Sequence, residues 1–64
     1  MKAQIKYTLW SPDLAPQEKT KTVHFEGDMW TGFEKARAEF HRQVKPTEGE
    51  RIDIIHVTLI DEGA

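Results

Sequence analysis

Apolar and polar residues alternate from the second residue of the chain to the tenth. The apolar positions in this segment are Ala3, Ile5, Tyr7 and Leu9. Because successive side chains of a strand point to opposite faces of a sheet, the pattern predicts a half-buried strand. Ser11-Pro12-Asp13 ends the strand, and we expect an exposed loop, stiffened by prolines, to continue through Glu18.

A second strand is predicted from Lys19 to Glu26. In this interpretation Val23 and Phe25 face the core, whereas His24 faces away. The start of the strand is rich in lysine and threonine, which suits the edge of a sheet because charged side chains there discourage pairing with other chains. Gly27-Asp28 ends the strand.

Helical spacing of apolar residues follows. The members of this single stripe are Met29, Phe33, Ala36, Phe40 and Val44. We therefore predict a helix from about Met29 to Val44, which Pro46 would stop. Either Asp28 or the capping box Thr31-x-x-Glu34 could begin this helix, because each offers a side-chain oxygen to the first turn.

The third strand is expected from Ile52 to Ile60, and it carries apolar residues on both faces. One face would hold Ile55, Val57 and Leu59. The other would hold Ile52, Ile54, His56, Thr58 and Ile60. Because one helix can cover only one face of a small sheet, the second face needs another cover, such as a twin subunit or a foreign partner.

These elements predict an α+β fold of order β-β-α-β, with a three-stranded, mainly antiparallel sheet of order 2-1-3 and one helix packed on one face. The 64 residues form one domain, 1–64, whose stability is marginal and which leaves no room for a deep substrate cavity. The expected core is Ile5, Tyr7, Leu9, Val23, Phe25, Met29, Trp30, Phe33, Ala36, Phe40, Val44, Ile55, Val57 and Leu59.

Composition excludes several classes of protein. Nine basic and eleven acidic residues give a net charge of −2, which argues against strong nucleic-acid binding. The chain has no cysteine, so disulfides and thiolate metal sites are excluded. No apolar run approaches the length of a membrane span, and the N-terminal segment does not read as a signal peptide. We expect a cytoplasmic protein that is a complete gene product and has no contact with a membrane.

Candidate catalytic and metal-binding residues are sparse. The histidines are His24, His41 and His56, and they show neither the H-x-H nor the H-x-x-x-H spacing of metal ligands. No hydroxyl nucleophile has a recognisable base, and the sequence holds no glycine-rich phosphate loop. We therefore predict that the protein is not an enzyme and has no metal, no cofactor and no small-molecule substrate.

The open face of the sheet instead indicates a protein partner. The candidate partner-binding residues are Trp10, Ile52, Ile54, His56, Ile60 and His24. Exposed apolar patches mark partner sites, and tryptophan is enriched among interface hot spots. We expect a homodimer in preference to a foreign partner, because a marginal domain gains most from a shared core. Alternatively, Trp10 and Trp30 cover the edges of the core.

Nucleic-acid binding is a second hypothesis for the same sheet. The residues that would contribute are Lys2, Lys6, Lys19, Lys21, Trp10 and Tyr7. Basic residues interleaved with aromatic ones can follow a single strand on a sheet face. The acidic residues Glu26 and Asp53 dilute the positive field, so we place this function second.

The chain is short, begins Met1-Lys2 and has Ile5 and Tyr7 in its first strand. It follows a β-β-α-β order and ends in a charged tail. In these features it resembles small proteins encoded by phages and mobile elements. These include inhibitors of host RNA polymerase, antitoxins and anti-defence proteins. The segment from Phe25 to Arg37 is also similar to the strand-to-helix step of HicB-type antitoxin domains. The resemblance implies a small inhibitor or regulator that acts by surface contact with a larger protein, and thus a non-enzymatic protein-binding module.

Overall fold

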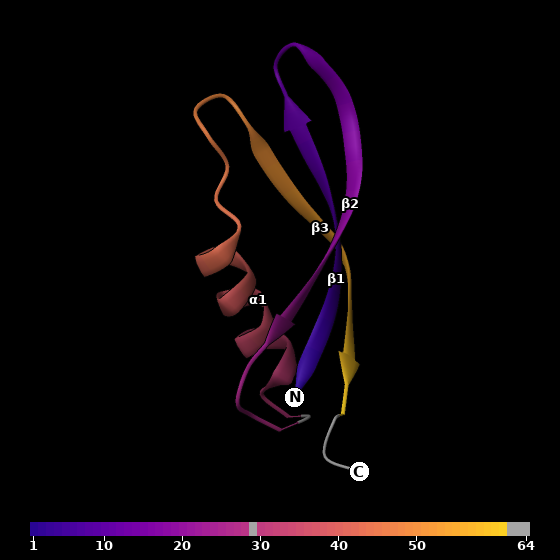
Figure 1. Cartoon of the computed structure of the whole chain (residues 1–64), viewed down its shortest axis with the longest axis vertical. Coiled ribbons are helices and arrows are strands. Elements are labelled where there is room, and N and C mark those ends of the chain that lie inside the picture. The colour runs from indigo at the N-terminus through magenta and orange to yellow at the C-terminus, as the bar shows by residue number, and fades with distance from the viewer. Residues whose placement is uncertain (29, 62–64) are drawn as a thin grey trace.

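A computed structural model describes residues 1–28 and 30–61 of the chain. Its elements are β1 (Lys2–Ser11), β2 (Leu14–His24), α1 (Gly32–Gln43) and β3 (Arg51–Ile60). The molecule is elongated, with extents of 44 × 17 × 14 Å. Figure 1 shows α1 beside one half of the sheet, while the β1–β2 hairpin extends past the helix.

The strands form a three-stranded sheet of order β2-β1-β3, and both pairings are antiparallel. The predicted fold class, strand order and single helix are therefore confirmed. β1 lies in the centre and pairs on both sides, whereas β2 and β3 are the edges of the described sheet. The helix packs on one face, and the other face is open (Figure 1).

The first hairpin is longer than the sequence pattern predicts. β2 begins at Leu14, so the loop expected up to Glu18 shortens to a turn at Pro12-Asp13. The register between the two strands shifts after Leu9, close to this turn. Pro16 is tolerated inside β2 because an edge strand does not need every backbone N–H for its sheet. A loop prediction based on prolines alone was therefore wrong.

Asp28 closes the turn that precedes the helix. Its Oδ1 accepts hydrogen bonds from the backbone N–H groups of Trp30 and Thr31, both at 3.0 Å, and from Thr31 Oγ1 at 3.2 Å. These bonds, above all the one from the Thr31 N–H, lower the pKa of Asp28. The Thr31 side chain makes no capping bond, so the capping box is not formed. The predicted helix start at Met29 lies outside the described residues, and α1 begins at Gly32.

The core lies between α1 and the half of the sheet that the helix covers. Tyr7 of β1 and Phe40 of α1 meet edge to face, with ring centroids 4.9 Å apart and an interplanar angle of 63°. The buried apolar residues are Ala3, Ile5, Tyr7, Val23, Ala36, Phe40 and Val57. Packed against them, and partly buried, are Phe25, Val44, Ile52, Ile54 and Leu59.

Three of the residues predicted for the core are exposed instead. Trp30, Phe33 and Ile55 expose 94%, 47% and 51% of their surface. Trp30 precedes the helix rather than lying within its first turn, so its side chain does not follow the apolar stripe. Phe33 lies at the edge of that stripe and stays about half exposed, although its neighbour Gly32 is buried. Ile55 is displaced by a change of register within β3.

That change of register is a β-bulge opposite the middle of β1. Lys6 pairs with His56, but the next residue, Tyr7, pairs with Ile54, so Ile55 is skipped by the ladder. A bulge places two residues of one strand opposite one residue of its partner and shifts the alternation by one position. The apolar residues before and after the bulge therefore reach the same face of the sheet.

The shared face is the one that α1 covers. The β3 residues whose partners in β1 lie on that face are Ile52, Ile54, Val57 and Leu59. The predicted placement of Ile52 and Ile54 on the open face was therefore wrong, because it assumed an unbroken period of two. Placing Ile55 in the core was wrong for the same reason.

The open face of the sheet is mainly polar. It carries an ion pair between β1 and β2, from Lys6 Nζ to Glu18 Oε1 at 3.0 Å, and one within β3, between Arg51 and Asp53 at 3.4 Å. Ile60 pairs with Lys2 near the other end and is half-buried. Without Ile52 and Ile54, the predicted apolar patch on this face does not form.

Candidate functional site

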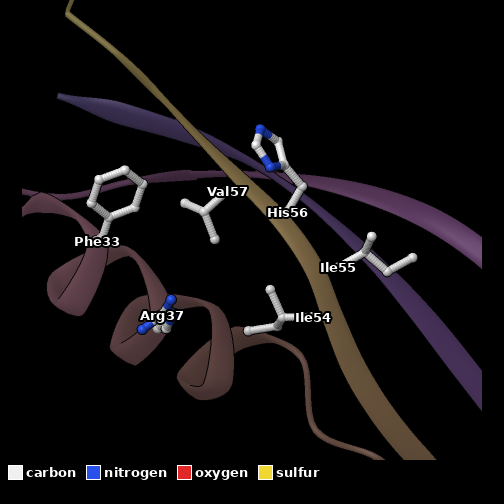
Figure 2. A pocket seen from close by; sticks show the side chains of 6 residues that line it. All are labelled: Phe33, Arg37, Ile54, Ile55, His56 and Val57. Carbon is white, nitrogen blue, oxygen red and sulfur yellow. The ribbon is translucent and has the colours of Figure 1, made fainter.

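An open groove of about 480 Å³ lies between α1 and the β3 edge of the sheet. Its lining residues are Phe33, Arg37, Ile54, Ile55, His56 and Val57. They are drawn in Figure 2. We call this surface the β3 groove. It combines four apolar side chains with two basic residue types and contains no acidic side chain.

Helix periodicity and the bulge together position the lining residues. Phe33 and Arg37 are four residues apart on α1, so they lie one turn apart on the same side of the helix. Figure 2 shows Ile54 and Val57 on the side of β3 nearest α1. Since the bulge inserts one residue between them, both can reach the helix although they are three positions apart.

The other two strand residues leave β3 on its far side. Figure 2 shows Ile55 and His56 pointing away from α1. Ile55 is half-exposed because the bulge leaves it without a partner in the ladder. The groove therefore runs along an edge strand whose apolar side chains reach both sides.

Arg37 is the charged residue of the β3 groove, and its side chain is exposed on α1. Within residues 1–28 and 30–61 it forms no ion pair or hydrogen bond through its guanidinium. Of the nearby acids, Glu39 pairs with Arg42 and Asp53 pairs with Arg51, while Glu34, one helical turn before Arg37, forms no ion pair with it among the described residues. The groove thus offers an uncompensated positive charge next to apolar surface.

The residues predicted to bind a partner do not form one patch. Trp10 lies at the hairpin end of the sheet, 39% exposed, with the Arg51 guanidinium 5.2 Å from its ring centroid. His24 and Ile60 both flank Lys2 at the opposite end. Only two members of the predicted set, Ile54 and His56, line the β3 groove. Ile52 packs against the core.

Sequence reasoning missed four residues of the groove. Phe33, Ile55 and Val57 were assigned to the core, and Arg37 was not singled out. A usable signal was present in the adjacent pair Ile54-Ile55, which breaks the alternation of the strand. Two adjacent apolar residues inside an alternating strand are compatible with a bulge as well as with a strand buried on both faces.

In the described parts of the chain, no three histidine or acidic side chains gather closely enough to hold a metal ion. Among these residues there is also no helix long and apolar enough to span a membrane. No protein-family model matches the sequence, and no curated protein or solved structure matches it either. The resemblance to phage-encoded inhibitors stays a prediction.

Proposed function

We propose that the chain is a non-enzymatic protein-binding module, an inhibitor or regulator that acts by contact between its β3 groove and a larger protein. The observation that carries the proposal is the exposure of Phe33 and Ile55 around the groove. Leaving apolar surface in water forgoes about 25 cal/mol for each Å² that a partner would cover. Exposed apolar surface next to polar residues is typical of partner sites.

A foreign partner is better supported than the homodimer that we expected from the sequence. The homodimer was inferred from an apolar open face, and that face is mainly polar because Ile52 and Ile54 lie on the other side. Pairing of two β3 edges is discouraged by the bulge at Ile55 and by the charged residues Arg51 and Asp53, both of which are devices that protect edge strands.

Nucleic-acid binding receives less support. On the open face Lys6 pairs with Glu18, and Arg51 pairs with Asp53 while also lying over the ring of Trp10. These contacts occupy basic groups that would otherwise attract phosphate. The net charge of −2 also lowers the electrostatic attraction to a polyanion.

The proposal is tested by capture with tagged protein from the organism that makes it. Phe33→Asp puts a charge into the β3 groove, whereas the control Leu14→Asp changes another exposed apolar residue at the hairpin tip, where 62% of Leu14 is exposed. We expect Phe33→Asp to lose the captured protein and Leu14→Asp to retain it, with both variants folded by circular dichroism. Retention by Phe33→Asp, or loss by both, would contradict the groove as the binding site.

A further inference from the structure

The arginines of the chain differ in whether they have an acidic partner. Arg42 donates through Nε to both carboxylate oxygens of Glu39, at 3.1 and 3.2 Å. This contact, with a further bond from Gln43, lowers the pKa of Glu39 to about 2. Arg51 pairs with Asp53. Arg37 stands on the same helix as Arg42 but has no such contact within the described chain.

The surroundings of Arg37 limit what could bind it. On the side of the β3 groove that faces α1, the lining residues other than Arg37 are the apolar Phe33, Ile54 and Val57. A ligand of Arg37 must therefore also present apolar surface to them. His56 adds an imidazole to the lining of the same groove, on the side of β3 away from α1. Recognition of phosphate groups generally uses clusters of arginines, whereas a single guanidinium matches one carboxylate through two parallel hydrogen bonds.

We infer that the β3 groove binds a segment of a foreign protein in which an apolar side chain lies next to an aspartate or glutamate. The apolar side chain fills the space between Phe33, Ile54 and Val57, and Arg37 binds the carboxylate. This inference rests on the proposed function and adds the chemistry of the partner. It follows from charge complementarity, because the groove holds a cation without an anion.

Peptide display with the whole chain as bait is the first test. A library of random, unphosphorylated peptides is selected in parallel against the wild type and against Phe33→Ser. We expect peptides enriched by the wild type, and not by the variant, to carry Asp or Glu adjacent to a large apolar residue or one position away. Circular dichroism verifies that Phe33→Ser is folded.

Affinity measurements then assign the carboxylate to Arg37. One enriched peptide and its amide version, with Asn or Gln in place of the acid, are titrated against wild type, Arg37→Gln and the control Arg42→Gln. We expect Arg37→Gln to weaken binding of the acidic peptide about tenfold, as loss of a charged hydrogen bond does, and to leave the amide peptide unaffected. Arg42→Gln should change neither affinity, because Arg42 is held by Glu39.

The outcomes separate the two proposals. If acidic and amide peptides bind the wild type equally, and both are lost in Phe33→Ser, the role of Arg37 is refuted while the groove remains a binding site. If no enriched peptide depends on Phe33, both proposals fail. Sedimentation at micromolar concentration tests whether a second copy of the chain fills the groove instead. A wild-type dimer that Phe33→Ser dissociates would assign the groove to that second copy and overturn the inference of a foreign segment.

Discussion

β1 and β3 are neighbours that face the same helix, but they reach it differently. In β1 the alternation is unbroken, and Ala3, Ile5 and Tyr7 are all buried. In β3 the alternation changes phase at the bulge, so that Ile54 and Val57 both turn towards α1. The change of phase leaves Ile55 half-exposed. The unbroken alternation of β1 therefore places successive apolar residues in the core, whereas the bulge in β3 supplies core and an exposed apolar side chain in the middle of the strand.

The positions of β1 and β3 in the sheet explain why only β3 tolerates a bulge. β1 is central and pairs on both sides, so an extra residue would disturb two ladders. β3 pairs only with β1 among the described strands, and a bulge disturbs one ladder. Bulges are common at sheet edges and next to functional sites, where they redirect side chains. The β3 groove coincides with the bulge at Ile55.

The largest effect should come from the core that both strands share. Phe40 is fully buried against Tyr7, and we expect Phe40→Ala to lower the free energy of unfolding by about 3–5 kcal/mol, as cavity-forming substitutions do. The matched variant Phe33→Ala should lower it by well under half as much, because Phe33 is half-exposed. Urea unfolding measures both. Equal losses would show that the helix is rotated from the phase described here.

The next test separates the two adjacent isoleucines at the bulge. Ile54→Ala should lower the free energy of unfolding by about 2–3 kcal/mol, because Ile54 packs against the core. Ile55→Ala should change it by about 0.5 kcal/mol or less, as exposed substitutions do. Urea unfolding of both variants decides the matter. A larger loss of stability for Ile55→Ala than for Ile54→Ala would show that β3 alternates without a bulge, and the contrast with β1 would disappear.

The fold could be predicted from the sequence because most of its signals are local. The alternation in β1, the helical stripe ending at Val44 and the stop at Pro46 each specify an element without reference to the others. The bulge, in contrast, depends on how two strands pair. The run Ile52-Asp53-Ile54-Ile55 is compatible with a strand buried on both faces, and only its pairing with β1 shows which isoleucine leaves the ladder.

The candidate site could be predicted only in part, for a related reason. A sequence shows that Arg37 is basic, but it does not show which acids are already paired. Glu39 engages Arg42 rather than Arg37, and that choice depends on side-chain positions. Phe33 has the spacing of a core residue, and the spacing alone does not show that about half of its surface is exposed. Ile54 and His56 are on both the predicted list and the lining of the groove because both belong to β3, although Ile54 was predicted on the open face.

A smaller effect should arise where β3 begins, before the bulge. Gly49 has a positive φ of 84°, and a Cβ there would lie 3.0 Å from Pro12 Cγ of the hairpin. We expect Gly49→Ala to lower the free energy of unfolding by about 1–2 kcal/mol, because other residues are strained in this conformation. Gly27→Ala is the control, since its nearest neighbour is the movable side chain of Lys35. Thermal unfolding compares them, and equal effects would argue against strain at the β3 start.

The smallest effect concerns the turn that sets α1 over both strands. Asp28→Ala removes the acceptor of the Trp30 and Thr31 hydrogen bonds and should lower the melting temperature by less than Gly49→Ala does. The hydrogen bonds lower the pKa of Asp28 in the folded state below the ordinary value of 3.8. A lowered folded-state pKa means that the stabilisation is present above pH 3.8 and is lost as the pH falls through the folded pKa.

The melting temperatures of wild type and Asp28→Ala should therefore differ at neutral pH and converge in acid below that folded pKa. Asp13→Ala, in the hairpin turn, is the control and should match the wild type throughout, because within the described residues the Asp13 side chain forms no hydrogen bond or ion pair. A difference for Asp28→Ala that persists unchanged in acid would mean that the carboxylate charge does not hold this turn. The position of α1 over β1 and β3 would then depend on packing alone, including that of Gly32 against Leu59, where an added Cβ would lie 2.8 Å from Leu59 Cδ1.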